Sequence, residues 1–263
     1  MAAVHGICVL CNRNGCLRIS HLIPAWAYKR ILRSDSDNER APVRIAGGSA
    51  VLTNKQITQR LLCTECELRF AKYERHLARL TMPVGDRIKF YEKLTRANVP
   101  SGRVAYCNDH GDADLIAYFA ASLLWRASVM SAACALGAYQ QEFQRYLLGE
   151  AQFPGNAVLG VGVFEPSTVR GTDTRRWISA PTRVRTPDGW LHGFLLCGLV
   201  FRCFVGGVVP NRLRQVSLAA PNQKRSIMLL SPEECPDFLA AAELAAVAKP
   251  RGKLAGGEVI VSR

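Results

Sequence analysis

Acidic side chains and long uninterrupted apolar runs are both scarce in this sequence. Its 263 residues include 21 Asp and Glu against 34 Lys and Arg, which gives a net charge of +13. Such an excess creates a positive field that attracts polyanions, so nucleic acid is the expected partner, ahead of an acidic protein or a membrane surface. The most apolar stretch, residues 193–209, is interrupted by Arg202 and rich in Gly and β-branched residues. This pattern favours buried strands over a membrane helix.

Several other signals are missing. The sequence has no internal repeat, and no Gly-rich loop of the kind that cradles phosphate. The first residues lack the basic start and apolar core of a signal peptide, and the ten cysteines do not form the dense pattern of a small secreted scaffold. We therefore expect a reducing, cytoplasmic location.

Four of the cysteines form two closely spaced pairs. Cys8 and Cys11 are separated by two residues, and so are Cys63 and Cys66. Two such pairs can supply four thiolates in a tetrahedron, which is how an intracellular protein usually holds a structural zinc ion. Cys16 lies near the first pair, but its neighbours are typical of a strand, so we predict that it is not a ligand.

The residues around the two pairs predict how the metal site is built. A turn-rich segment, 12–15, follows the first pair, and residues 16–21 have the alternation of a short strand. The second pair opens a segment, 66–81, with apolar residues at helical spacing. A knuckle, a hairpin and a helix that carries the last two ligands make a treble-clef zinc module.

Three motifs in this module resemble the zinc-bearing HNH endonuclease family. They are Cys8-x-x-Cys11, the sequence Ser-His-Leu-Ile-Pro at 20–24, and Leu-Cys-x-x-Cys-Glu at 62–67. In that family the central His is the general base that activates water. The acidic residue before this His and the His after the last Cys bind a catalytic divalent cation. The resemblance covers roughly the first 75 residues.

Carried over by this resemblance, His21 is the candidate general base. Ser20 replaces the acidic ligand and Glu67 replaces the ligand His, so Glu67 is the candidate for holding Mg²⁺ or Mn²⁺. A carboxylate is a hard ligand suited to these ions, whereas a neutral hydroxyl is a weak one. Asn54 is the candidate for the family's Asn, although Gln59 lies nearer the expected position.

The middle of the chain, residues 82–150, is predicted to be helical. We expect a helix over 87–96 and a long helical segment over 112–149. Cys107 and His110 have metal-ligand spacing, but no second pair follows them, so this segment is interpreted as a loop before a helix that Asp112 caps. Arg126 lies among apolar residues and needs a carboxylate or several carbonyl partners. We expect it to tie this helix to the zinc module or to the sheet.

The last part of the chain, residues 151–263, is predicted to be rich in strands. Expected strands cover 157–165, 175–185, 190–209 and 213–218, with a turn at 187–189. A late helix should begin near Ser231 and run to about 247, and residues 258–262 could form an edge strand. The fold class is therefore α+β, with a treble-clef zinc module at 1–81, a helical region at 82–150 and a β-rich region at 151–263.

Two functions follow from these observations. The first is a metal-dependent, HNH-like endonuclease that hydrolyses phosphodiester bonds, with DNA as the expected nucleic acid and with a structural zinc ion besides the catalytic cation. The alternative is a catalytically inactive zinc module that binds nucleic acid or a protein partner. A structural or assembly protein is a third interpretation. The sequence does not determine the oligomeric state.

Overall fold

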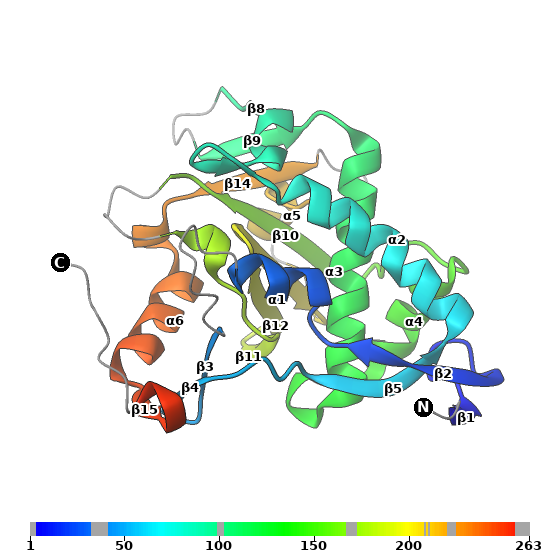
Figure 1. The fold of residues 1–263 in the computed structure, drawn as a ribbon. Helices are drawn as coiled ribbons and strands as arrows, with labels where there is room; N and C mark the ends of the chain where they lie inside the picture. Colours follow the sequence, from blue (N-terminus) through cyan, green and yellow to red (C-terminus); the bar gives the residue numbers. More distant parts are fainter. Residues whose placement is uncertain are drawn as a thin grey trace.

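The structure is a computed structural model that describes residues 4–32, 42–98, 103–166, 173–207, 209, 211–219 and 225–255, apart from the side chains of residues 110 and 212. It confirms the α+β class and places a four-cysteine cluster in the N-terminal part. A long central helix and a C-terminal set of strands follow in the chain (Figure 1). The predicted edge strand at 258–262 lies outside the described residues.

The N-terminal part is a small antiparallel sheet with a helix against it. Strands β1 (Val4–Ile7), β2 (Asn14–His21) and β5 (Thr58–Cys63) lie in the order β1-β2-β5, and helix α2 (Thr64–Leu80) follows β5 directly. Between β2 and β5 come α1 (Ala25–Leu32) and the hairpin of β3 (Val43–Ala46) and β4 (Ser49–Leu52). Here β1, β2, β5 and the start of α2 are called the cysteine clef.

A seven-stranded sheet forms the centre of the molecule. Its order is β11 (Thr182–Thr186), β12 (Gly189–Leu196), β13 (Leu199–Val205), β10 (Ala157–Phe164), β14 (Ser226–Leu230), β9 (Val104–Cys107) and β8 (Leu94–Arg96). The pairing of β10 with β14 is parallel, and the other pairings are antiparallel. Two of its strands come from the region predicted to be helical, so the sheet crosses the predicted boundary at residue 150.

Three predictions made from the sequence are wrong for segments in or next to the seven-stranded sheet. Residues 87–96 form β7 (Arg87–Ile88), the 3₁₀ helix η1 (Lys89–Lys93) and β8 instead of an α-helix. Their charged residues favour a helix, but Ile88 and Phe90 are buried and hold the chain in this irregular path. The predicted strand at 213–218 overlaps the short helix α5 (Asn211–Gln215). The strand predicted at 175–185 begins only at Thr182.

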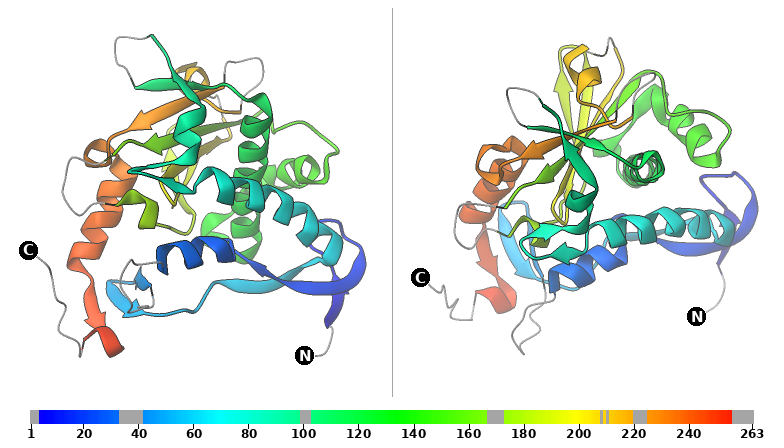
Figure 2. Two further views of the ribbon diagram at one scale, coloured as in Figure 1. Left: turned by 45° about the horizontal axis from the view of Figure 1, so that its top comes forward. Right: turned by 90° about the horizontal axis from the view of Figure 1, so that it is seen from above.

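Helix α3 (His110–Met130) packs on one face of the seven-stranded sheet. Figure 2 shows it end-on at one side of the sheet, with α6 (Pro236–Val247) at the other side. By length and composition, residues 111–130 of α3 could cross a membrane, but 78% of this stretch is buried inside the protein. Apolar residues on nearly all sides are typical of a buried core helix.

One apolar core joins the three predicted regions. It runs from Cys8 and Leu62 through Phe70 of α2 and Phe119 of α3 to Phe201 of the sheet. Two smaller clusters lie on the other face of the sheet, one under α6 and one beside α5. Helix α4 (Gln140–Leu148) packs against α3. The remaining described strands are β6 (Pro83–Val84) and β15 (Lys249–Arg251), which pairs with β4.

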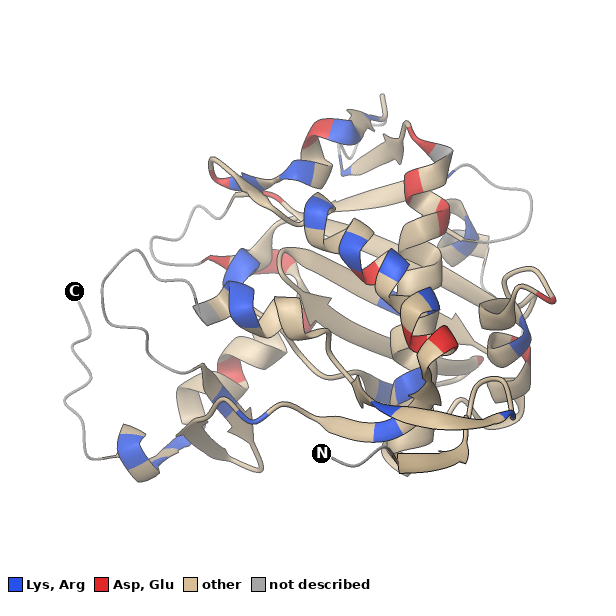
Figure 3. Cartoon of the chain, turned by 45° about the vertical axis from the view of Figure 1, so that its right-hand side comes forward, with Lys and Arg blue, Asp and Glu red and all other residues tan. Residues whose placement is uncertain are grey.

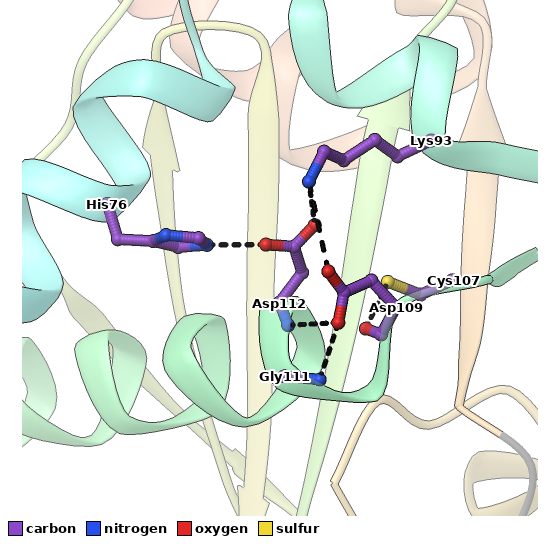
Figure 4. A network of polar contacts seen from close by, with 6 residues as sticks. All are labelled: His76, Lys93, Cys107, Asp109, Gly111 and Asp112. Carbon is purple, nitrogen blue, oxygen red and sulfur yellow. Dashed lines mark hydrogen bonds and ion pairs between the residues drawn. The ribbon is translucent and has the colours of Figure 1, made fainter.

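The N-cap of α3 is Asp109 and not the predicted Asp112. The Asp109 carboxylate accepts hydrogen bonds from the backbone N–H groups of Gly111 and Asp112. Asp112 is instead a buried carboxylate, 2.7 Å from Nε2 of His76 on α2 and 2.5 Å from Nζ of Lys93 on η1 (Figure 4). Burial lowers the pKa of His76, although Asp112 opposes this. The network ties α2 and η1 to the start of α3.

Candidate metal centre and its surroundings

The four predicted cysteines come together in the cysteine clef. The sulfur atoms of Cys8, Cys11, Cys63 and Cys66 all lie within 4.8 Å of one another, and those of Cys11 and Cys63 are 3.8 Å apart. A metal bound tetrahedrally by thiolates at about 2.3 Å has ligand sulfurs about 3.8 Å apart. The arrangement is therefore compatible with a structural metal site. Cys16 lies outside the cluster, as predicted.

Backbone contacts shape the first half of this site. The N–H group of Cys8 donates to the carbonyl of Arg13 at 2.9 Å, and Asn12 donates back to the carbonyl of Cys8 at 2.8 Å. Asn12 has a φ of 57°, a left-handed conformation that Asn tolerates better than most residues. Val9 donates to Leu61 of β5 at 3.0 Å. The knuckle is thus fixed against the strand that leads to the second pair.

The thiols have different acidities before any metal binds. Burial raises the pKa of Cys8, but backbone hydrogen bonds from Cys11, Cys63 and Leu10 more than offset this and lower the pKa to about 7. Burial raises the pKa of Cys66, and the neighbouring thiols raise it further. Burial and the neighbouring thiols thus oppose ionisation of Cys66, whose thiolate a bound cation would stabilise.

The two residues that depart from the HNH pattern contact each other. Ser20 is fully buried, and its hydroxyl donates a hydrogen bond to a carboxylate oxygen of Glu67 on α2. Burial raises the pKa of Glu67, and the bond from Ser20 opposes that rise. Serine at position 20 thus serves as a hydrogen-bond donor that holds the Glu67 carboxylate between strand and helix.

His21 ends β2 beside a charge pair formed by the buried Arg126 and the partly exposed Glu74. Arg126 on α3 is 1% exposed, and its Nη2 lies 2.8 Å from Oε1 of Glu74. Its Nη1 donates to the backbone carbonyl of His21 at 2.6 Å. Arg126 therefore ties α3 to the cysteine clef, as we expected from its apolar neighbours. Burial lowers the pKa of the His21 imidazole, with Glu74 opposing and Arg126 reinforcing this.

The described residues around His21 do not form a site in which three or more side chains could hold a second divalent cation. Within the described part of the chain, the four cysteines are the only group of three or more Cys, His, Asp or Glu side chains placed to share an ion. Glu67 is bonded to Ser20, and Glu74 faces the positive charge of Arg126. The guanidinium of Arg126 already places a positive charge beside Glu74 and would repel a metal ion there. Metal binding would therefore require these side chains to move.

The candidates for the family's Asn lie on the path into β5. Asn54 is exposed in the connection between β4 and β5, and Gln59 is the strand partner of Ser20 in the pairing of β5 with β2. Of the two, Gln59 is therefore the one that sits opposite the Ser20–His21 end of β2. The catalytic roles of His21, Glu67 and Asn54 stay predictions.

A row of basic residues on α2 was not singled out from the sequence. Lys72, Arg75 and Arg79 are exposed and recur at steps of three and four residues, which places them on one side of the helix. Figure 3 shows Lys and Arg recurring along this helix. No ion pair involves any of the three within the described residues. Their helical spacing was the signal that could have identified this basic row.

Other arginines near the clef have structural partners. Arg69, one turn earlier on α2, donates to the carbonyl of Leu148 at the end of α4 at 2.6 Å. Arg30 on α1 donates to Ala78 at 2.9 Å near the end of α2. These two side chains hold helices together, so they are weaker candidates for phosphate contacts than the basic row.

Comparison with known proteins adds no relative: no family model matches the chain, and neither a curated protein nor a solved structure matches it.

Proposed function

We propose that this protein binds nucleic acid through a zinc-stabilised cysteine clef, with the basic row Lys72, Arg75 and Arg79 as its phosphate-contacting surface. The observation that carries the proposal is this exposed row of three cations without ion-pair partners among the described residues. Cations along one helix face suit the regular spacing of backbone phosphates. The net charge of +13 adds long-range attraction.

Zinc is the metal that we propose for the four thiols. Four cysteine ligands in a tetrahedron are typical of structural zinc, and the 3.8 Å separation of Cys11 and Cys63 agrees with zinc–sulfur bonds. When bound, the ion would fix the knuckle and β5 to the start of α2. The basic row would then sit on a helix anchored at its first turn by the metal.

Endonuclease activity at His21 is the second candidate function. The observation that favours it is the lowered pKa of His21, which keeps the imidazole neutral near pH 7 and able to accept a proton from water. Glu67 of α2 is held by Ser20, the residue that precedes His21 in β2. Because the described residues around His21 do not form a site for a divalent cation, the role proposed for His21 is limited to accepting this proton.

Binding is tested by fluorescence anisotropy with a labelled 30-base-pair DNA duplex at several salt concentrations. Replacing Lys72, Arg75 and Arg79 together by Ala should weaken binding and reduce the salt slope by about 0.9 for each lost phosphate contact. The matched control replaces three exposed cations at the other end of the chain, Lys249, Arg251 and Lys253. Equal losses in both triple variants would show that overall charge alone drives binding, and would contradict the assigned surface.

Cleavage is tested with supercoiled plasmid in Mg²⁺ and in Mn²⁺. The wild type is compared with His21→Ala and Glu67→Ala at equal zinc content. Cleavage that disappears in both variants would establish the nuclease function. Binding without cleavage under either ion would leave the binding function alone.

A further inference from the structure

A cavity lies on the face of the seven-stranded sheet that α3 does not cover. It has a volume of about 500 Å³, in the range of small-molecule sites. Side chains from four strands form its floor: Val158, Leu191, Phe204 and Met228, with Gly160 among them. The cavity is remote in the fold from the cysteine clef, which packs with α2 and α3 on the opposite face.

Glycine and the surrounding helices explain why this space is hollow. Gly160 of β10 contributes no side chain to the floor, and a Cβ atom there would meet only ordinary contacts, the nearest being Met228 at 3.5 Å. Leu213 of α5 and Val216 form one wall, while Pro236 and Asp237 at the start of α6 form another. The two helices cover the sheet on either side and leave the middle open.

A charge pair and one further carboxylate, that of Asp188 in the exposed turn between β11 and β12, interrupt this apolar lining. Nε of Arg202 donates to Oδ2 of Asp237 at 2.6 Å, and Nη2 makes a second bond to the same oxygen. The two side chains are 26% and 33% exposed. The two charges of this pair cancel each other. The pair therefore offers an ionic ligand little attraction to offset the free-energy cost of removing that ligand from water. It still presents guanidinium donors beside carboxylate acceptors, which suits a neutral group that both donates and accepts.

We propose that this cavity binds a neutral small molecule with an apolar, ring-sized body and an amide-like edge that pairs with Arg202 and Asp237. The apolar floor takes the body, and the charge pair orients the polar edge. A carboxylate ligand would face the Asp237 carboxylate, and an ammonium ligand would face the Arg202 guanidinium. Both ions are therefore disfavoured relative to the neutral amide of the same shape.

Three probes with one apolar body test the proposal: 2-naphthamide, 2-naphthoate and 2-naphthylmethylammonium. Dissociation constants are measured by ligand-observed NMR titration of the full chain. We expect the amide to bind about tenfold more tightly than either ion, a difference of about 1.4 kcal/mol. Absence of amide binding, or a preference for either ion, would overturn the proposal.

Two variants and one control variant locate the binding and test its electrostatics. Gly160→Leu fills the floor and should abolish amide binding, whereas Gly155→Leu, at an exposed glycine with no neighbouring atom within 4 Å, should leave it unchanged. Asp237→Asn keeps the shape but leaves the Arg202 charge uncancelled, so the preference should change from amide to naphthoate. Amide binding retained in Gly160→Leu, or an unchanged preference in Asp237→Asn, would contradict the assigned site.

Discussion

The cysteine clef and the seven-stranded sheet differ in the interactions that stabilise each of them. In β2, Ser20 is the one fully buried residue, whereas seven of the eight residues of β10 are buried. Burial of apolar surface stabilises β10 between two layers of side chains, at roughly 25 cal/mol for each Å² removed from water. The strands of the clef bury less, although Cys8, Leu61 and Leu62 belong to the same apolar core. If the four cysteines bind the proposed metal ion, that ion would supply stability to the clef that the sheet obtains from burial alone.

The largest expected effect comes from removing one thiolate of the clef. Cys63→Ser should abolish tight metal binding and cost several kcal/mol locally, because folding of the clef and metal binding are coupled. Hydrogen exchange should show lost protection in β1, β2 and β5, with β10 and β13 still protected. Cys16→Ser is the matched control, since Cys16 lies in β2 but outside the cluster. Equal loss in both variants would contradict the comparison.

The next effect concerns the contact between the clef and α3. Arg126→Met should lower the free energy of unfolding by about 3–5 kcal/mol, because it leaves Glu74 and the His21 carbonyl without their buried partner. Urea denaturation measures this. Arg13→Met is the control, because Arg13 pairs with Glu65 and the two side chains are 78% and 83% exposed. That exposed pair should contribute less than about 1 kcal/mol. Similar losses of unfolding free energy in the two variants would show that Arg126 does not hold α3 to the cysteine clef.

A smaller effect should appear in the sheet as the pH falls. His192 of β12 is 1% exposed, and burial lowers its pKa to about 4, with Arg183 adding to the shift. Below pH 6.5 the unfolded state binds a proton that the folded state does not, so stability is complete above pH 6.5 and is lost as the pH falls towards 4. The full loss is about 3 kcal/mol.

The His192 contribution is isolated by comparing the wild type with His192→Gln. Chemical denaturation at several pH values should show a smaller loss of stability between pH 6.5 and 4 in the variant. Parallel pH profiles for the two proteins would show that His192 takes up its proton equally in the folded state.

The cysteine clef was more predictable from the sequence than its surroundings. Cysteine spacing is a local signal with few alternative explanations, so the clustering of the four cysteines and the helix after Cys63 were predicted correctly. The long central helix was also predictable, and so was the need of Arg126 for a carboxylate and carbonyl partners. In each case the signal lay within short stretches of chain, such as each of the two cysteine pairs.

Features that depend on distant partners were not predictable. Residues 94–96 become a strand because β9 pairs with them, and β9 in turn joins β14 from a stretch more than a hundred residues later. The bond from Ser20 to Glu67 needs the packing of β2 on α2, so the sequence indicated that Ser20 was a lost metal ligand and not a partner of Glu67. The cavity near Arg202 requires three-dimensional assembly of four strands and two helices.

Elemental analysis of the purified protein, prepared without chelator, tests the central claim most directly. We expect one zinc ion per chain in the wild type and in Cys16→Ser, and its loss in Cys63→Ser. If hydrogen exchange showed that the cysteine clef of the wild type is folded while the protein contains no zinc, the claim that a metal ion stabilises the clef would be contradicted.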